Sequence, residues 1–469
     1  MICFGTGGWR AEIGKDFYIG NIRLIAQALA NCIKKDGKED KPVVVGYDRR
    51  FLSSQAAAWA TEVLAANNIP VLFMRRSVPT PLVMYIVKER GLHYGIEITA
   101  SHNPSNYNGI KVIVDEGRDA PIAVTESLER EAAAVSEPLV KPIDQAIEAG
   151  IVSYLENPFN PFIDDILAVL DTGAIRARGP RILFDSMHGS SSYPLNVIFH
   201  TTRCTVDQIH GNRDAYFGGL MPAPNECTMG ELQTLVVQGG YDLGIAVDGD
   251  GDRLGVIDGT GQYISANEIL VLLYYYLHEY KGWKGPVVRN LSTTHLLDRV
   301  AESLGETCYE VPVGFKYISA KIDEVDAILG GESSGGLTVR GHIHGKDSVY
   351  SSALFVEMIC KTGLYPSEMI KKISQPFGCY IMEEENIAFP AQRRAELSKK
   401  ILDDHALPDF AKIPSKVSYM DGCKVYFADD SFVVCRFSGT EPLLRIFAEA
   451  HTKTKAQKYI SAWKKMLGL

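Results

Sequence analysis

Short apolar runs alternate with helix-length amphipathic segments over most of the 469-residue chain. The runs at 43–45 and 71–74 flank a segment, 54–66, with the length and spacing of a helix. Because a strand, a helix and a further strand form the repeating unit of parallel sheets, this order predicts an α/β fold. The same patterns predict strands at 94–99, 109–114, 182–184, 243–247, 286–289 and 327–329, and a helix at 294–304.

The C-terminal part of the chain follows a different pattern. Predicted strands lie close together at 423–427, 432–436 and 444–449. Helices are predicted before and after them, at 390–405 and 454–466. Strands in succession, with helices grouped outside them, indicate an α+β unit with an antiparallel sheet that has helices on one face.

Proline-containing stretches mark candidate joints between domains, at 137–161, 263–267 and 365–378. Length alone favours about three domains at roughly 150 residues each. These three joints instead favour a division into four domains. The predicted domains are α/β at 1–150, 151–260 and 261–372, and α+β at 373–469.

Composition limits the class of protein. Hydrophobic residues make up 46% and charged residues 22%, which is typical of a globular chain, and the formal net charge is −9. An acidic balance gives no support to a nucleic-acid or membrane partner. The first residues show no basic patch followed by an apolar stretch, so we expect no secretory signal. The longest apolar run (269–277) is too short to cross a bilayer, and the nine cysteines include no C-x-x-C pair. We therefore expect a cytoplasmic protein with reduced thiols.

Four loops carry side chains that could take part in catalysis or binding. The first of these loops directly follows a predicted strand. It reads T-A-S-H-N-P-S-N-Y-N-G-I-K from Thr99 to Lys111. Ser101 stands where the chain leaves the sheet, so its hydroxyl could be a nucleophile or carry a phosphoryl group, with His102 and Lys111 as polar neighbours. A polar turn with a helix-capping serine is the plain alternative.

The second loop is the most specific. The apolar strand at 243–247 runs into Asp248-Gly-Asp-Gly-Asp-Arg253. On a loop that glycine allows to curve, three alternating carboxylates can converge on one hard cation, whereas without a cation they would repel each other. An EF-hand would need glycine at the sixth position of the loop and glutamate at the twelfth, where this chain has Arg253 and Gly259. That interpretation therefore fails. A haloacid-dehalogenase-type phosphatase is a weaker alternative, because Asp252 fills a slot that is usually hydrophobic or threonine.

The third loop is rich in glycine and reads G-G-E-S-S-G-G from Gly330 to Gly336. Its carboxylate and hydroxyls suit hydrogen bonds to sugar hydroxyls, although a generic turn is equally compatible. Downstream, His342, His344 and Lys346 could act as acid or base.

The fourth loop, R-F-S-G-T-E-P-L-L-R, runs from Arg436 to Arg445 between two predicted strands. Two arginines, two hydroxyls and glycine N–H groups form a plausible phosphate-binding site. A β-turn with surface arginines is the alternative. Such local cations explain how an acidic protein could bind an anion.

Together, in this order, the loops resemble those of the α-D-phosphohexomutase family. The match extends over the whole chain, and it includes F-G-T-G-G-W-R at the N-terminus, D-S-M-H-G from Asp185 and V-G-F-K ending at Lys316. The resemblance implies three similar α/β domains with mixed, largely parallel sheets and a C-terminal α+β domain around a central cleft. It also implies hexose phosphates as small-molecule partners, no nucleic acid or membrane, and a monomer or homodimer.

The resemblance further implies a role for each loop. Ser101 would carry the phosphoryl group, and Asp248, Asp250 and Asp252 would bind Mg²⁺ with a phosphoserine oxygen. Lys111 and Arg253 would stabilise the group in transfer, and a hexose 1,6-bisphosphate would serve as activator and intermediate. The residues that would bind the substrate are Arg10, His102, Lys316, Glu332, Ser334, Arg436, Ser438, Gly439, Thr440 and Arg445.

Departures from the family's motifs bear on the substrate and on the base. Ser333 stands where many phosphoglucomutases have a second glutamate, and Gly336 where the phosphomannomutase/phosphoglucomutase type has a basic histidine. Lys346 is the leading candidate for the acid/base group, with His342 second. The leading hypothesis is therefore a phosphoglucomutase that interconverts glucose 1-phosphate and glucose 6-phosphate. The alternatives are a phosphomannomutase, a phosphoglucosamine mutase, a glucose 1,6-bisphosphate synthase or an inactive sugar-phosphate-binding protein.

Overall fold

The structure is a computed structural model that describes residues 2–5, 7–438 and 443–469. The chain forms two compact units, Met1–Ile269 with Ser334–Ser367 and Leu270–Ser333 with Glu368–Leu469. The third predicted domain, 261–372, contributes to both units. The four domain boundaries and the central cleft stay predictions, whereas the α/β fold with a C-terminal α+β sheet is confirmed.

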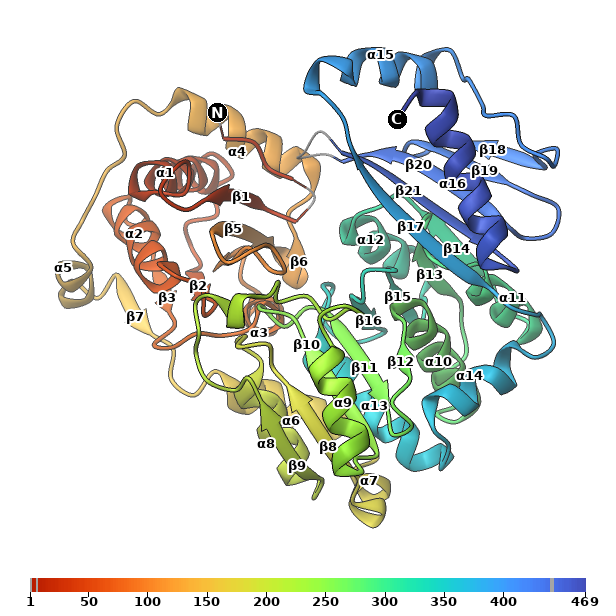
Figure 1. Ribbon diagram of the computed structural model, residues 1–469. Helices are drawn as coiled ribbons and strands as arrows, with labels where there is room; N and C mark the ends of the chain where they lie inside the picture. The colour runs from red at the N-terminus through yellow and green to blue at the C-terminus, as the bar shows by residue number, and fades with distance from the viewer. Residues whose placement is uncertain (1, 6, 439–442) are drawn as a thin grey trace. The chain divides into compact units, whose positions relative to one another are not determined.

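The first sheet has seven strands in the order β1-β5-β4-β2-β3-β7, with β6 paired to β5 (Figure 1). Pairing is parallel among β2, β3, β4 and β7 and antiparallel at β1, β5 and β6. The strands are β1 (Trp9–Glu12), β2 (Val43–Tyr47), β3 (Val71–Phe73), β4 (Tyr94–Ile98), β5 (Tyr107–Val114), β6 (Arg118–Asp119) and β7 (Val152–Tyr154). The helices are α1 (Ile19–Lys35), α2 (Ser53–Ala66), α3 (Thr80–Glu89), α4 (Ile122–Ala134) and α5 (Ile143–Glu148), with the 3₁₀ turn η1 (Asp115–Gly117).

Strand β2 shows why this sheet needs helices on both faces. Val43 and Val45 pack into the core that α1, α2 and α4 share. Val44 points to the opposite face, toward α3. There a Cβ added to Gly95 would lie 3.1 Å from the Val44 side chain and 2.8 Å from that of Val87 of α3, so the three residues pack closely. Successive side chains of a strand alternate between faces, so a run of three valines is buried on both sides.

The second sheet, in the order β12-β11-β10-β8-β9, is parallel at β8, β9 and β10 and antiparallel at β11 and β12. Its strands are β8 (Arg181–Asp185), β9 (Thr205–Ile209), β10 (Leu243–Val247), β11 (Leu254–Asp258) and β12 (Tyr263–Ile264). The associated helices are α6 (Phe159–Val169), α7 (Thr172–Arg178), α8 (Ser192–Thr201) and α9 (Gly230–Gly239), with the 3₁₀ turn η2 (Phe217–Gly219).

In the next part of the chain, β13 pairs in parallel with β14 and with β15. The strands here are β13 (Val287–Asn290), β14 (Cys308–Val311), β15 (Leu329–Gly331) and β16 (Leu337–Val339). The helices are α10 (Ala266–Glu279), α11 (Leu296–Ser303), α12 (Phe315–Val325), α13 (Ser348–Thr362) and α14 (Pro366–Ser374). Helix α13 begins at a side-chain cap, because Asp347 accepts from the N–H groups of Val349 and Tyr350.

The last sheet is antiparallel throughout, in the order β17-β21-β20-β19-β18, as predicted for this region. Its strands are β17 (Ile381–Ala388), β18 (Lys416–Ser418), β19 (Cys423–Tyr426), β20 (Phe432–Phe437) and β21 (Leu443–Ala450). The single helix predicted at 390–405 is instead three short pieces, η3 (Ala391–Arg393), α15 (Arg394–Ser398) and the π-helical η4 (Lys399–Asp403). Leu397 of α15 and Ile401 of η4 share one core with α16 (Lys453–Leu467), whose N-cap is Thr452 (Figure 1).

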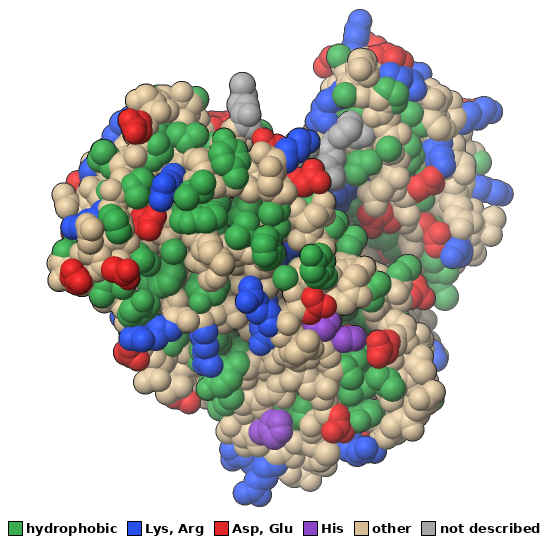
Figure 2. Space-filling model, turned by 60° about the vertical axis from the view of Figure 1, so that its left-hand side comes forward, with side chains coloured by type: hydrophobic (Ala, Val, Ile, Leu, Met, Phe, Trp, Pro, Cys, Tyr) green, Lys and Arg blue, Asp and Glu red, His purple; other side chains and the backbone are tan. Residues whose placement is uncertain are grey.

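On the face drawn in Figure 2, acidic and basic side chains lie interspersed, with hydrophobic ones between them. Among the described residues, no helix has both the length and the apolar character that a bilayer crossing demands. The longest apolar run, 269–277, is buried within α10.

Candidate active site

Three aspartates directly follow β10, at the carboxyl end of a strand that pairs in parallel with β8. Asp248, Asp250 and Asp252 are buried, and one ligand oxygen from each lies within 4.8 Å of the others. Gly251, between them, has a φ of 74°, and a Cβ there would stand 2.0 Å from Ser191 Oγ. Glycine therefore permits the tight turn that brings the carboxylates together.

This aspartate cluster (Asp248, Asp250 and Asp252) contains carboxylate oxygens that form no hydrogen bond. Asp250 Oδ2 accepts from Thr80 Oγ1 at 2.7 Å and from Lys111 Nζ at 2.6 Å, and Asp252 Oδ2 accepts from Lys111 at 2.8 Å. The Oδ1 atoms of Asp250 and Asp252 are buried without a hydrogen-bond partner. Unpaired buried carboxylate oxygens are costly, and hard divalent cations prefer oxygen ligands. The donor set therefore fits a divalent cation.

Charge in the cluster is unevenly distributed. Burial, followed by repulsion from Asp252 and Asp250, holds the pKa of Asp248 well above its usual range. Burial acts in the same direction on Asp252, but attraction by Lys111 and Lys346 outweighs it and holds that pKa well below its usual range. Burial would lower the pKa of Lys111, yet Asp250 and Asp252 raise it. Lys111 is therefore a permanent cation between two carboxylates.

Ser101 lies against this cluster. Its side chain is buried, and its Oγ donates to Asp248 Oδ2 at 3.2 Å. The residue has a φ of 51°, a left-handed conformation that is unusual for serine, and its N–H donates to Thr99 Oγ1 at 2.8 Å. A Cβ on Gly249 would stand 3.0 Å from the carbonyl oxygen of Ser101, so this second glycine lets the two loops approach. The predicted nucleophile and the predicted metal ligands thus meet.

Further cations lie close to the residues that neighbour Ser101. Arg10 of β1 donates to Asn103 Oδ1 at 2.7 Å, and Arg253 Nε lies 3.7 Å from Asp252 Oδ1. His102 Nδ1 lies 3.4 Å from Ser101 Oγ. Burial, then the charges of Arg253 and Arg10, holds the pKa of His102 well below its usual range, so this imidazole is neutral near pH 7. In the first unit, Arg10 and Arg253 therefore act electrostatically on the residue next to Ser101.

The two acid/base candidates differ in their contacts. Lys346 Nζ lies 3.1 Å from Asp252 Oδ2, at the aspartate cluster. A Cβ on Gly336 would stand 2.1 Å from the Lys346 side chain, so glycine here makes room for that lysine. His342 Nε2 instead lies 2.6 Å from Asp347 Oδ2, and its ring packs on Tyr350. Asp347 is the N-cap of α13, so His342 stabilises the start of that helix by holding its capping residue.

Glu332, from the predicted sugar loop, belongs to the second unit and is largely buried at the end of β15. Asn290, at the end of β13, donates to Glu332 Oε1 at 3.3 Å, and its own Oδ1 accepts from Ser292 and Thr293. Ser334 lies in the first unit, beside Gly335, whose carbonyl accepts the Leu254 N–H.

The phosphate-loop residues also lie in the second unit. Arg436 of β20 stands directly opposite Arg445 of β21, and both Nε atoms are buried without a hydrogen-bond partner. Like charges opposite each other destabilise a sheet unless an anion lies between them. Arg436 also pairs with Asp421 at 3.2 Å, whose carboxylate accepts the Val313 N–H close to Lys316 in the chain.

The remaining phosphate-loop predictions have different outcomes. Ser438 is buried, and its N–H donates to the Leu443 carbonyl at 2.8 Å. Gly439 and Thr440 lie outside the described residues, so their predicted roles stay predictions.

Sequence reasoning missed Thr80, which holds Asp250 with both its hydroxyl and its N–H. The residue stands between two prolines, Pro79 and Pro81, at the start of α3. That Pro-Thr-Pro turn after a strand was an available signal, since it presents a hydroxyl at a fixed helix start. Glu97 was also missed. It is buried on β4 opposite Lys111, its oxygens lack hydrogen-bond partners, and burial raises its pKa well above its usual range.

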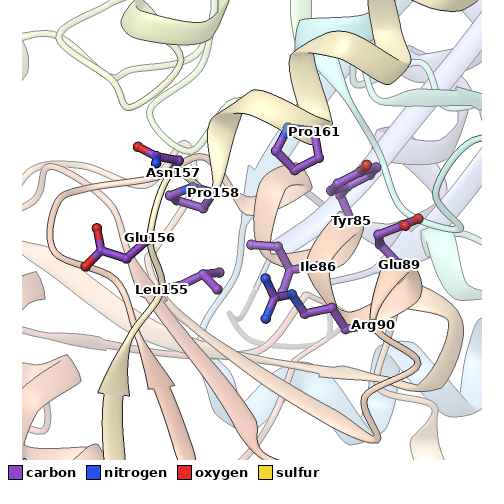
Figure 3. Close-up of a pocket in the computed structure, with 9 residues that line it drawn as sticks. All are labelled: Tyr85, Ile86, Glu89, Arg90, Leu155, Glu156, Asn157, Pro158 and Pro161. Atoms are coloured by element: carbon purple, nitrogen blue, oxygen red, sulfur yellow. The ribbon is translucent and has the colours of Figure 1, made fainter.

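One small pocket lies elsewhere in the first unit, with a volume of about 100 Å³ (Figure 3). Side chains from the end of α3 line one part of it, and residues 155–161 line the other. None of the predicted site residues lines it, and ligand pockets are usually about 300 Å³ or more.

Family models match the chain in four consecutive parts. They are the phosphoglucomutase/phosphomannomutase α/β/α domains I (residues 1–138), II (160–261) and III (265–377) and the C-terminal domain of the same family (388–463). The chain belongs to the phosphoglucomutase/phosphomannomutase family. It is therefore a phosphohexomutase, an isomerase that moves a phosphoryl group within a sugar phosphate.

Relatives of this phosphohexomutase match along nearly their whole length. A "Phosphoglucomutase/phosphomannomutase" of Thermococcus kodakarensis is 29% identical, over 99% of this chain and 98% of the relative. A "Probable phosphoglucosamine mutase" of Methanothermobacter thermautotrophicus is 30% identical, over 97% and 95%. A crystal structure of a Thermus thermophilus protein, provisionally named as a phosphomannomutase, matches with a TM-score of 0.86 at 26% identity, over 100% and 99%.

Proposed function

We propose that this phosphohexomutase works through a phosphorylated Ser101 and that its preferred substrate is glucosamine phosphate. The observation that carries the proposal is the contact of Ser101 Oγ with Asp248 Oδ2, at 3.2 Å, in an aspartate cluster that Lys111 also contacts. A hydroxyl held against metal-binding carboxylates and lysine is suited to exchange a phosphoryl group and not to hydrolyse an ester.

In this mechanism, phosphoserine donates its phosphoryl group to the free hydroxyl of a hexosamine monophosphate, giving the 1,6-bisphosphate. The intermediate reorients, and its other phosphate returns a phosphoryl group to Ser101. Lys111 stays charged because Asp250 and Asp252 raise its pKa, so it can stabilise the oxygens of the group in transfer. Arg253, beside Asp252, and Arg10, which donates to Asn103, would supply further positive charge.

The aspartate cluster is the proposed Mg²⁺ site. Asp248, Asp250 and Asp252 would hold the ion, which would neutralise negative charge at the phosphoserine. The unpaired Oδ1 atoms of Asp250 and Asp252 support this assignment.

Lys346 is the proposed acid/base group, and His342 is now the weaker candidate. The Lys346 amine lies at the aspartate cluster, within reach of a proton on the attacking or leaving hydroxyl, whereas the facing nitrogen of His342 is engaged by Asp347. Arg436 and Arg445 are proposed to hold the phosphate that is not reacting, because their paired guanidinium groups suit an anion.

The substrate assignment departs from the glucose phosphate hypothesis. The names of the relatives favour phosphoglucosamine or phosphomannose chemistry over glucose phosphate alone. A carboxylate such as Glu332, oriented by Asn290, can accept a hydrogen bond from a sugar hydroxyl or pair with the ammonium of glucosamine. Mannose and glucose phosphates are the second candidate, since one relative carries a combined phosphoglucomutase/phosphomannomutase name.

Two measurements test the proposal. Phosphopeptide mass spectrometry of the purified protein should place the phosphate on Ser101, and Ser101→Ala should lower the turnover rate by at least ~10³-fold. Coupled assays with glucosamine, mannose and glucose 1-phosphates should rank glucosamine phosphate first. A fully active protein without phosphate would overturn the mechanism, and a clear preference for glucose or mannose phosphate would overturn the substrate.

A further inference from the structure

Arg50 is a completely buried cation that the sequence motifs do not single out. It lies between β2 and α2, and none of its side-chain surface is exposed. Its guanidinium donates to four backbone carbonyls of one loop. Nη2 donates to Ser101 O at 2.5 Å and to Asn103 O at 2.6 Å, and Nη1 donates to Pro104 O at 2.8 Å and to Tyr107 O at 3.1 Å.

The guanidinium is itself held in place from two sides. Asp48 Oδ2 lies 3.4 Å from Arg50 Nε, and Asp48 Oδ1 accepts from the Arg50 N–H at 2.9 Å and from Ser53 Oγ at 2.6 Å. The ring of Phe217, from η2, lies over the guanidinium at 4.8 Å. A planar group fixed by a carboxylate and a ring has little freedom, so the carbonyls bound to it are fixed as well.

These carbonyls belong to the loop that sets the direction of Ser101. Serine holds a left-handed φ of 51° there, a conformation that L-residues adopt only when their surroundings impose it. The Ser101 carbonyl is one of the atoms that Arg50 holds, while Ser101 Oγ points to Asp248. Arg50 thus fixes the backbone of Ser101, while the side-chain hydroxyl of the same residue contacts the aspartate cluster.

We propose that Arg50 is a positioning residue for phosphoryl transfer, acting by holding the carbonyls of residues 101–107 so that Ser101 Oγ stays at the aspartate cluster. The inference rests on the proposed role of Ser101. The guanidinium of Arg50 binds the loop through backbone carbonyls and not through the Ser101 hydroxyl, so its effect on that hydroxyl passes through the backbone. A lysine could not replace it, because one ammonium cannot span four carbonyls with a planar fork of donors.

The test compares Arg50→Lys and Arg50→Met with the neighbouring Arg49→Lys. Arg49 donates to the Gly211 carbonyl and makes no described contact with the 101–107 loop, so it is the matched control. Each protein is charged with ³²P from labelled glucose 1,6-bisphosphate. Single-turnover transfer to hexosamine monophosphate is then followed by rapid quench, and substrate affinity is measured separately by calorimetry.

Both Arg50 variants should transfer the phosphoryl group about 10²-fold more slowly, the scale of a misplacement near 1 Å, while the substrate dissociation constant changes less than about threefold. Arg49→Lys should match the wild type. Retention of the wild-type transfer rate by either folded Arg50 variant would overturn the inference. So would a Lys variant that restores the rate lost in the Met variant, because a point charge would then suffice.

Phe217→Leu tests the same inference if the Arg50 variants fail to fold. Removing the ring that covers the guanidinium should slow transfer about tenfold at unchanged substrate affinity, and an unchanged rate would count against the positioning role. The wild-type data separate the two proposals. A wild type that is inactive, or that carries phosphate on another residue, would remove the proposed function and this inference with it, whereas an active wild type leaves the decision to the variants alone.

Discussion

Two buried clusters of charged side chains, one in each unit, differ in how completely their polar atoms are bonded. In the first unit, the aspartate cluster leaves two buried carboxylate oxygens without a hydrogen-bond partner. In the second unit, the Lys424 cluster (Arg289, Glu310 and Lys424) uses its charges fully. Lys424 Nζ contacts Glu310 Oε2 at 2.6 Å, the Leu291 carbonyl at 2.7 Å and His295 Nε2 at 3.0 Å.

The pKa shifts do not separate the two clusters, because each contains a carboxyl with a lowered pKa, Asp252 in the first and Glu310 in the second. Burial opposes ionisation of Glu310, but Lys424 and Arg289 outweigh it and lower the pKa of that carboxyl to about 2. Arg289 also forms a two-point pair with Asp298, at 2.6 and 2.8 Å. Burial alone therefore does not identify a site. The distinguishing feature is a buried polar atom without a hydrogen-bond partner. The aspartate cluster has such atoms at Asp250 Oδ1 and Asp252 Oδ1, whereas Lys424 Nζ is fully hydrogen-bonded.

The largest expected effect comes from removing one metal ligand. Asp250→Asn should lower turnover by about 10³-fold at moderate Mg²⁺ and raise the Mg²⁺ concentration needed for half-maximal activity, because a neutral amide is a weaker ligand. Titrating activity with Mg²⁺ measures both. The control is Asp258→Asn, since Asp258 is equally buried but accepts from the turn at Thr260 and Gln262. Equal Mg²⁺ dependence in the two variants would remove the aspartate cluster from its role.

The second cluster should respond in stability and not in metal dependence. Lys424→Met leaves Glu310 buried without its nearest cation and should lower the free energy of unfolding by about 3 kcal/mol. Urea denaturation measures the loss, and the Mg²⁺ requirement should stay that of the wild type. Exposed Lys465 on α16 offers the matched control, where methionine should change stability by less than about 0.5 kcal/mol. Equal losses at the two positions would contradict the contrast between the two clusters.

The acid/base candidates allow a finer test within the first unit. Lys346→Met should slow turnover by about 10²-fold and alter the pH–rate profile, as expected for loss of a general acid/base. His342→Gln should change the rate less than about threefold and instead weaken the cap at Asp347, lowering the melting temperature. A larger rate loss in the histidine variant would reverse the two assignments.

Sequence motifs predicted the parts of the site whose residues are close together in the chain. The Asp248–Asp252 loop and the Ser101 loop each follow a recognisable strand, and the structure has strands β10 and β4 at those positions. Arg50 could not be found in that way, because Ser101 lies 51 residues away and no local pattern marks a long-range hydrogen bond. For Thr80 the Pro-Thr-Pro turn was a local signal, but it did not identify Asp250, 170 residues away, as the partner.

The fold shows the same limit. Strand β17 was not predicted because it is an edge strand of the last sheet, and its Glu383, Glu384 and Glu385 conceal the apolar alternation of a buried strand. The helix predicted at 390–405 has suitable periodicity, yet it breaks into 3₁₀, α and π turns. There the packing of Leu397 and Ile401 against the α16 core decides the local geometry, and propensity does not.

The smallest expected effect concerns pH and Glu449, which accepts the His295 N–H beside the Lys424 cluster. Burial raises its pKa to about 7, above the ordinary 4.5. The folded state therefore holds the proton more tightly, so this contribution to stability is complete below pH 4.5 and is lost as pH rises through 7. Glu449→Gln keeps the hydrogen-bond acceptor without the titration. Between pH 5 and 8 the wild type should lose about 2 kcal/mol relative to the variant in urea denaturation, because the variant lacks the titrating carboxyl. Parallel stability curves would mean that Glu449 is already ionised in the fold, and the second cluster would then tolerate an uncompensated charge as the first one does.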